Sequence, residues 1–105
     1  MLCFKKGVNI CNITPHLVLA MIVVDQVFDE LGSQLMITSV DDGVHGKKTL
    51  HGKGRAFDCR IWYLDTKQQL QACQIIRQRL GPHFDVVLEP DHIHIEYDPK
   101  EAAGA

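Results

Sequence analysis

The chain lacks the features that mark membrane, exported or nucleic-acid-binding proteins. Its apolar run over residues 17–24 is far shorter than the roughly 20 residues needed to span a bilayer. No small-residue cleavage site follows that run, so we predict no signal peptide and a cytoplasmic protein, released to the cell wall only during lysis. Lys and Arg number 11 against 13 Asp and Glu. This balance lacks the basic excess of nucleic-acid-binding proteins, so we expect neither nucleic acid nor membrane as a partner.

The chain also lacks a cysteine framework. Its four cysteines include no CxxC pair, and a hydrophobic fraction of 46% allows a core that needs no disulfides. We therefore expect reduced thiols that are buried or half-buried. A length of 105 residues fits a single domain over 1–105, and nothing in the sequence requires more than a monomer. The four cysteines are Cys3, Cys11, Cys59 and Cys73.

Two amphipathic helices are predicted. Thr14, followed by proline, is typical of a helix start, and Gly32 of a helix end. Asp65-x-x-Gln68 resembles a capping box and begins a second helix that runs to about Leu80. The positions of this second helix expected to face inward are Leu70, Cys73, Ile76 and Leu80.

Strand-like segments surround these helices. They are expected over 35–40, 55–63, 84–88 and 92–97, with a glycine-rich loop over 41–53 and a frayed tail over 98–105. Because the last two strands are so tightly connected, an antiparallel sheet covered on one face by two helices is the simplest packing. The predicted fold class is α+β. Trp62 and Tyr63 are expected in the core or at the rim of the site.

The histidines and acids of two short segments suggest a metal site. His92 and His94 share one face of the last strand, and Asp58 lies on an earlier strand, so His94 and Asp58 can meet across the sheet. His51 would arrive from the loop edge. Two imidazoles and a carboxylate are a common protein ligand set for catalytic zinc, because they leave a fourth tetrahedral position for water.

The first segment carries a specific motif. Thr49-x-His51-x-x-Gly54-x-Ala56-x-Asp58 resembles the Ser/Thr-x-His-x-x-Gly-x-Ala-x-Asp signature of the D-Ala-D-Ala carboxypeptidase family. That family includes VanX-type dipeptidases and phage L-alanyl-D-glutamate endolysins, and it is grouped with lysostaphin and the Hedgehog signalling domain. The resemblance implies a Hedgehog-like fold and a zinc metallopeptidase that hydrolyses peptidoglycan.

The second segment resembles the second motif of the same family. Asp91-x-x-His94 matches an acid three residues before the last zinc ligand. The resemblance therefore implies one zinc ion per chain, held by His51, Asp58 and His94. It extends from about Thr38 to Tyr97, most of the chain.

The same resemblance implies catalytic roles. Asp91 matches the general base, which should have its pKa tuned by a dry, metal-adjacent pocket. His92 would hydrogen-bond the oxyanion or orient a ligand, and His45 matches a histidine six residues before the first ligand in Hedgehog-type members. Strand alternation puts Asp91 on the face opposite His94 unless the turn breaks the alternation. Glu89 is the alternative base, and otherwise a solvated turn residue.

The two motifs leave alternatives open for the substrate-binding residues and for the activity. Arg60 either holds a substrate carboxylate bidentately or forms a salt bridge to a surface acid, and Thr49 either contacts substrate or shapes the loop. The expected substrate is a peptidoglycan stem peptide or another D-Ala-containing peptide. The alternative function is a non-catalytic or degenerate Hedgehog-like zinc-binding module.

Overall fold

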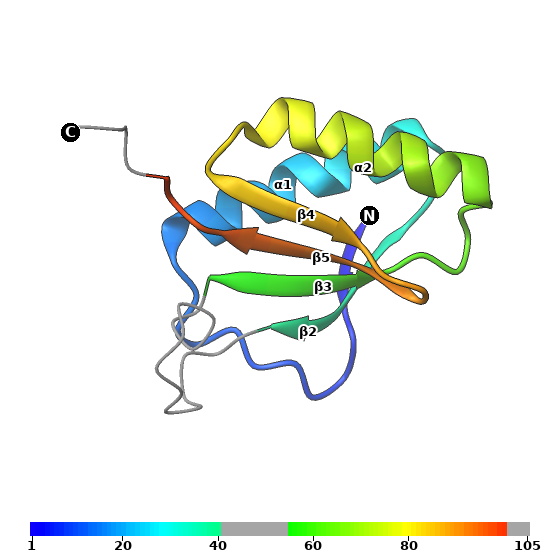
Figure 1. The fold of residues 1–105 in the computed structure, drawn as a ribbon. Coiled ribbons are helices and arrows are strands. Elements are labelled where there is room, and N and C mark those ends of the chain that lie inside the picture. The colour runs from blue at the N-terminus through cyan, green and yellow to red at the C-terminus, as the bar shows by residue number, and fades with distance from the viewer. Residues whose placement is uncertain (41–54, 101–105) are drawn as a thin grey trace.

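The computed structural model describes residues 1–40 and 55–100 (Figure 1). His45, Thr49 and His51 lie outside these ranges. The described elements, in chain order, are β1 (Leu2–Phe4), α1 (Pro15–Glu30), β2 (Leu35–Val40), β3 (Ala56–Arg60), α2 (Thr66–Leu80), β4 (Phe84–Leu88) and β5 (His92–Tyr97).

The strands form one five-stranded sheet in the order β1-β2-β3-β5-β4. Three of the four pairings are antiparallel, but β1 runs parallel to β2. The prediction of a purely antiparallel sheet was therefore wrong, and it missed β1 entirely. A strand of three residues is too short to give an alternation pattern, and it forms because its backbone pairs with the edge of β2.

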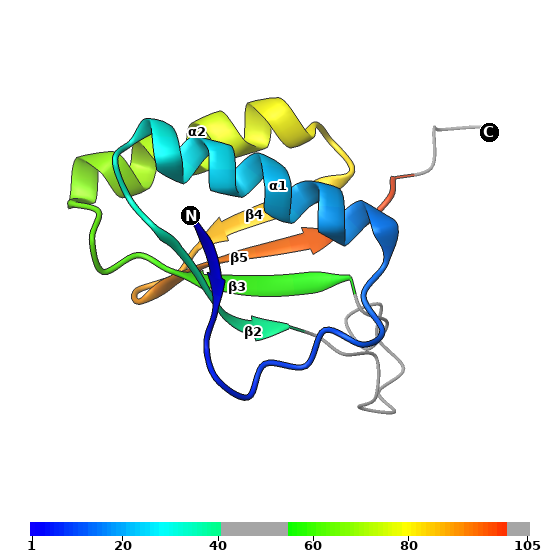
Figure 2. The ribbon, with the colours of Figure 1, turned by 180° about the vertical axis from the view of Figure 1, so that it is seen from behind.

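Both helices cover the same face of the sheet, as Figures 1 and 2 show. The apolar residues of α1 and α2 pack against every second residue of the strands, so the core lies on that side. This arrangement confirms an α+β domain with two helices on one face. The fully buried large side chains include Leu17, Phe28, Leu35, Ile37, Phe57, Ile76, Ile93 and Ile95.

The helix ends follow the predicted capping chemistry. The Thr14 hydroxyl accepts a hydrogen bond from the Leu17 amide at 3.3 Å, and Gly32 takes a positive φ of 76° just after α1. Asp65 accepts from the Gln68 amide at 2.8 Å, and the Gln68 side chain accepts from the Asp65 amide at 3.0 Å. Of the described helices, none is long and apolar enough to cross a membrane.

Several burial predictions were wrong. Leu70 is 59% exposed, because it lies on the solvent side of α2. Of the two alternatives for Trp62 and Tyr63, the core is excluded because both are exposed after the end of β3, whereas Trp62 lies at the rim of the pocket beside Asp58 and His92. All four cysteines are free, as predicted, but Cys11 is exposed.

The start of the predicted frayed tail is hydrogen-bonded. The Asp98 amide donates to the His83 carbonyl, and the Lys100 amide donates to Nδ1 of His83, each at 2.8 Å. The Lys100 ammonium also contacts Asp85 at 3.1 Å. The prediction of fraying was wrong for 98–100, because hydrogen bonds to His83 in the turn before β4 and the ion pair with Asp85 on β4 fix this segment.

Candidate functional site

The candidate site lies on the sheet face opposite the helices. Asp58 on β3 pairs with His94 on β5, and Arg60 pairs with His92 two residues along the same strands. The residues between them are buried in the core on the other face. Alternation therefore turns Asp58, His92 and His94 outward together, as the sequence predicted.

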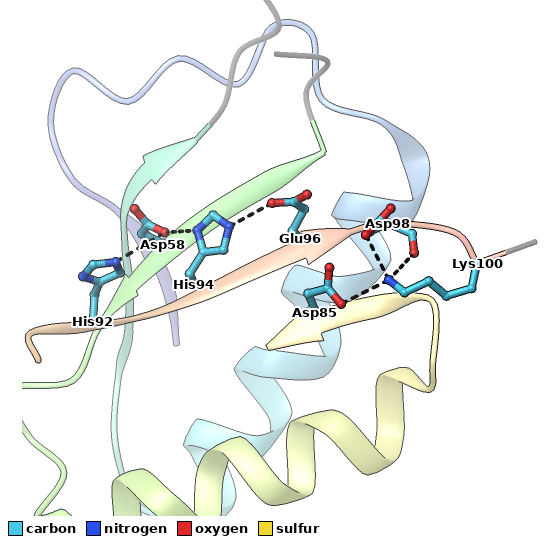
Figure 3. A network of polar contacts seen from close by, with 7 residues as sticks. All are labelled: Asp58, Asp85, His92, His94, Glu96, Asp98 and Lys100. Carbon is cyan, nitrogen blue, oxygen red and sulfur yellow. Dashed lines mark hydrogen bonds and ion pairs between the residues drawn. The ribbon is translucent and has the colours of Figure 1, made fainter. Parts of the chain in front are cut away.

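His94 is held between two carboxylates (Figure 3). Its Nδ1 lies 2.7 Å from Oδ1 of Asp58, and its Nε2 lies 3.1 Å from Oε1 of Glu96. The Glu96 side chain is only 6% exposed. The hydrogen bond to Asp58, together with that to Glu96, raises the pKa of His94 to about 9. In the metal-free chain, a proton on His94 therefore balances the two acids.

His92 extends this row on the other side of Asp58. Its Nε2 lies 3.7 Å from Oδ1 of Asp58, and its Nδ1 lies 2.6 Å from Oδ1 of Asp91. Asp91 precedes β5 and turns back to its neighbour, so the turn does break the strand alternation. Asp91 therefore lines the same pocket as Asp58 and His92.

The environment of Asp91 differs from the prediction. Its side chain is 82% exposed, so the expected dry pocket was wrong at this position. The hydrogen bond from His92 lowers the pKa of Asp91 below its ordinary value. An exposed carboxylate with a lowered pKa is a weak base by itself, and its contact with His92 is the feature that can carry proton transfer.

The alternative base, Glu89, lies apart from this group. Its amide donates to the His92 carbonyl at 2.8 Å, closing the turn between β4 and β5. Its half-buried side chain does not line the pocket that Asp58, Asp91 and His92 share. The geometry therefore favours Asp91 over Glu89.

Arg60 contacts an aromatic ring in the structure. Its guanidinium carbon stands 3.7 Å from the centre of the Trp62 ring, and no carboxylate within the described ranges forms an ion pair with it. The salt bridge to a surface acid is thus not seen in this part of the chain. The Arg60 guanidinium lies over the indole ring of Trp62 instead.

The donor types suit zinc. Imidazole nitrogen and carboxylate oxygen are both common zinc ligands, and Asp58 and His94 bring one of each to the same point of the sheet face. Histidine ligands usually have their second ring nitrogen held by a carboxylate or carbonyl. Glu96 is in that position. Asp58 and His94 could therefore hold a metal from one side, and the other predicted ligand, His51, lies outside the described residues.

A cluster of three acidic residues is a second candidate metal site. Asp85, Glu96 and Asp98 offer oxygens within 4.8 Å of one another. Their all-oxygen character suits Mg²⁺ or Ca²⁺ better than zinc. The Lys100 ammonium already lies 3.1 Å from Asp85 and 3.0 Å from Asp98 (Figure 3). This cluster therefore has its own cation.

Glu96 was not predicted as a site residue, and Trp62 was predicted only as part of the core or of the rim of the site. For Glu96 the signal was present, because a residue two positions after His94 on a strand shares its face. For Trp62 there was no comparable signal, since it follows β3 and its position depends on the turn into α2.

Comparisons of the chain with protein-family models, with curated proteins and with solved structures found no match.

Proposed function

We propose that the protein is a zinc-dependent metallopeptidase that hydrolyses peptide bonds of bacterial peptidoglycan, related to the D-Ala-D-Ala carboxypeptidases and phage endolysins. The observation that carries the proposal is the pairing of Asp58 and His94 at 2.7 Å across β3 and β5. These two residues belong to different motifs, 36 positions apart, and both motifs resemble the same family. Such a relation also implies a Hedgehog-like fold for the domain.

Asp58, His94 and His51 would hold one zinc ion. Zinc supplies a Lewis acid for the scissile carbonyl and lowers the pKa of its water to about 7. The buried carboxylate of Glu96 fixes the ring of His94, so Nδ1 stays aimed at Asp58. This support orients the ligand without touching the substrate.

Proton transfer is assigned to the pair of Asp91 and His92. His92 turns Nε2 towards Asp58 and its Nδ1 to Asp91, so it can accept a proton next to the ligands. The Asp91 carboxylate stabilises the imidazolium that results, and the proton then passes to the leaving amine. His92 is the donor and acceptor in this scheme, and Asp91 orients it.

The first test is zinc content with cleavage of purified peptidoglycan. We expect about one zinc per chain in the wild type, bound tightly enough to survive gel filtration, together with new amino termini in the digest. His94→Ala should lose both zinc and cleavage. His83→Ala is a matched control, because the His83 ring accepts a hydrogen bond from the Lys100 amide and lies in the turn before β4, not on β3 or β5. Wild-type protein without zinc, or zinc retained in His94→Ala, would refute the assignment.

A non-catalytic zinc-binding module is the second candidate. The exposure of Asp91 and its lowered pKa favour it, because both make this acid a weaker base. Full zinc occupancy without any cleavage of peptidoglycan or of D-Ala-D-Ala peptides would decide for this module. Cleavage at full occupancy would decide for the enzyme.

A further inference from the structure

We infer that Arg77 keeps the edge strand β4 from pairing with β4 of a second copy of this chain. This role of Arg77 lies outside the proposed peptidase function and does not depend on it. Three features support the role: the open side of β4, the residues of β4 and the contact of Arg77 with this strand.

Strand β4 has an open side. It pairs with β5, and no described strand lies on its other side (Figure 1). The Glu89 amide donates to the His92 carbonyl, so by antiparallel alternation the backbone N–H and C=O groups of residues 84, 86 and 88 point away from β5. A hollow of about 520 Å³ runs along this edge and is lined by Arg77 of α2 and by residues 84–87 of β4, among others. The outward backbone groups are therefore within reach of another chain.

The residues of β4 suit pairing with another strand. Phe84–Leu88 contains no lysine or proline, and its five pairs with β5 run without a bulge. Lysine, proline, bulges and very short strands are the usual means by which proteins protect a sheet edge. The opposite edge, β1, has only three residues, whereas β4 has five. The edge at β4 therefore needs another form of protection.

Arg77 supplies this protection from α2. Its Nε donates to the Val86 carbonyl at 3.1 Å, and its Nη2 donates to the same oxygen at 2.8 Å. Val86 is the middle residue of β4, so its carbonyl is the central acceptor on the open side. A new strand must displace both donors before it can pair with Val86, and hydrogen bonds from a charged donor are stronger than neutral ones.

A second copy of β4 fits this edge once Arg77 leaves it. In an antiparallel pair centred on Val86, each Val86 amide donates to the Val86 carbonyl of the other copy. Asp85 then lies opposite Val87 of the other copy, so no like charges face each other across the pair. Such a contact uses the same surface on both copies and closes as a two-fold dimer. Because Val87 is the register partner of His94, this dimer would lie beside the candidate site.

The test measures self-association of the full, metal-free chain by analytical ultracentrifugation. We expect the wild type to be monomeric and Arg77→Ala to form dimers, with a dissociation constant about 10- to 100-fold lower because two charged hydrogen bonds no longer compete. Arg79→Ala is the matched control, since Arg79 lies two residues along α2 and pairs with Glu30 instead, and it should behave like the wild type. Equal dissociation constants for Arg77→Ala and the wild type would overturn the inference.

Hydrogen exchange locates the contact. As the concentration of Arg77→Ala rises, the amides of Val86 and Leu88 should exchange more slowly, because these outward donors gain carbonyl partners. The same amides in the wild type should exchange at a rate that does not depend on concentration. Association of Arg77→Ala without protection of these two amides would show that another surface is used, and would overturn the pairing through β4.

Two further variants separate pairing from loss of folding. Arg77→Met keeps an unbranched apolar stem but has no N–H donor, so it should dimerise like Arg77→Ala, and it replaces that variant if Arg77→Ala does not fold. Adding Val87→Glu places a carboxylate opposite Asp85 of the other copy and should restore the monomer. Val87 is 42% exposed, so the folded chain has room for this change. Arg77→Met that stays monomeric, or a double variant that stays dimeric, would contradict the pairing through β4.

Discussion

At the scale of single residues, the key feature is a histidine with a carboxylate at each ring nitrogen. Asp58 and Glu96 hold His94 from two sides, and this arrangement raises the pKa of His94 to about 9 in the metal-free chain. A metal and a proton would then compete for the same nitrogen, because a ligating imidazole must be neutral. The two states of His94 exclude one another.

This competition makes zinc binding depend on pH. The raised pKa of His94 lies above neutrality, so between pH 7 and 8 zinc must displace its proton. We predict that zinc affinity rises by about tenfold from pH 7 to pH 8. Competition with a chelator, corrected for the protonation of the chelator, measures this slope. An affinity that stays constant over this range would show that His94 is not a ligand.

Glu96 offers a separate test of ligand orientation. Glu96→Gln keeps the size of the side chain but removes the charge that holds Nε2 of His94. We predict a loss of about 10- to 100-fold in zinc affinity. The two affinities are compared at a pH high enough that His94 is deprotonated in both proteins, because the variant has a lower pKa of His94 and this would otherwise hide part of the loss. Asp85→Asn, on the neighbouring strand, is the control. A larger loss of zinc affinity in Asp85→Asn than in Glu96→Gln would indicate that the metal binds to the acidic cluster of Asp85, Glu96 and Asp98 instead.

At the scale of elements, local chemistry explains why the helices were predictable. The side chains of Thr14, Asp65 and Gln68 make the capping contacts within a few residues of themselves. The pairing of Asp58 with His94 was also predictable, because alternation along two strands fixes which side chains share a face.

Features that depend on distant contacts were not predictable. β1 forms only because it docks on β2, and three residues carry no periodic signal of their own. The stacking of Arg60 on Trp62 depends on how the chain leaves β3. Neither the parallel edge strand nor the contact of Arg60 with Trp62 could therefore be predicted from local sequence patterns.

The capping box gives a prediction at this scale. Asp65→Ala removes the acceptor for the Gln68 amide at the start of α2. We predict a loss of about 1 kcal/mol in the free energy of unfolding, measured by urea denaturation. Lys67→Ala in the same turn should change it by less than about 0.5 kcal/mol. If Asp65→Ala changed the free energy of unfolding no more than Lys67→Ala does, tertiary packing alone would stabilise this end of α2.

At the scale of the whole molecule, the two faces of the sheet have different tasks. The helices and the apolar residues of the strands build a core on one side, which holds β3 and β5 in register. The opposite face carries an ionisable row from His92 through Asp58 and His94 to Glu96 (Figure 3). Asp91 extends this row beyond His92. The core thus fixes the positions of a polar site that contributes little to the core itself.

The most direct measurement of the central claim is peptidoglycan cleavage by Asp91→Asn at full zinc occupancy. Asparagine keeps the size of Asp91 but loses the charge that stabilises a protonated His92. We predict that zinc content stays at about one per chain, as in the wild type, while kcat falls by about 10²- to 10⁴-fold. Wild-type cleavage rates in this variant would contradict proton transfer through Asp91 and His92, and a wild-type protein that holds zinc but cleaves nothing would contradict the peptidase itself.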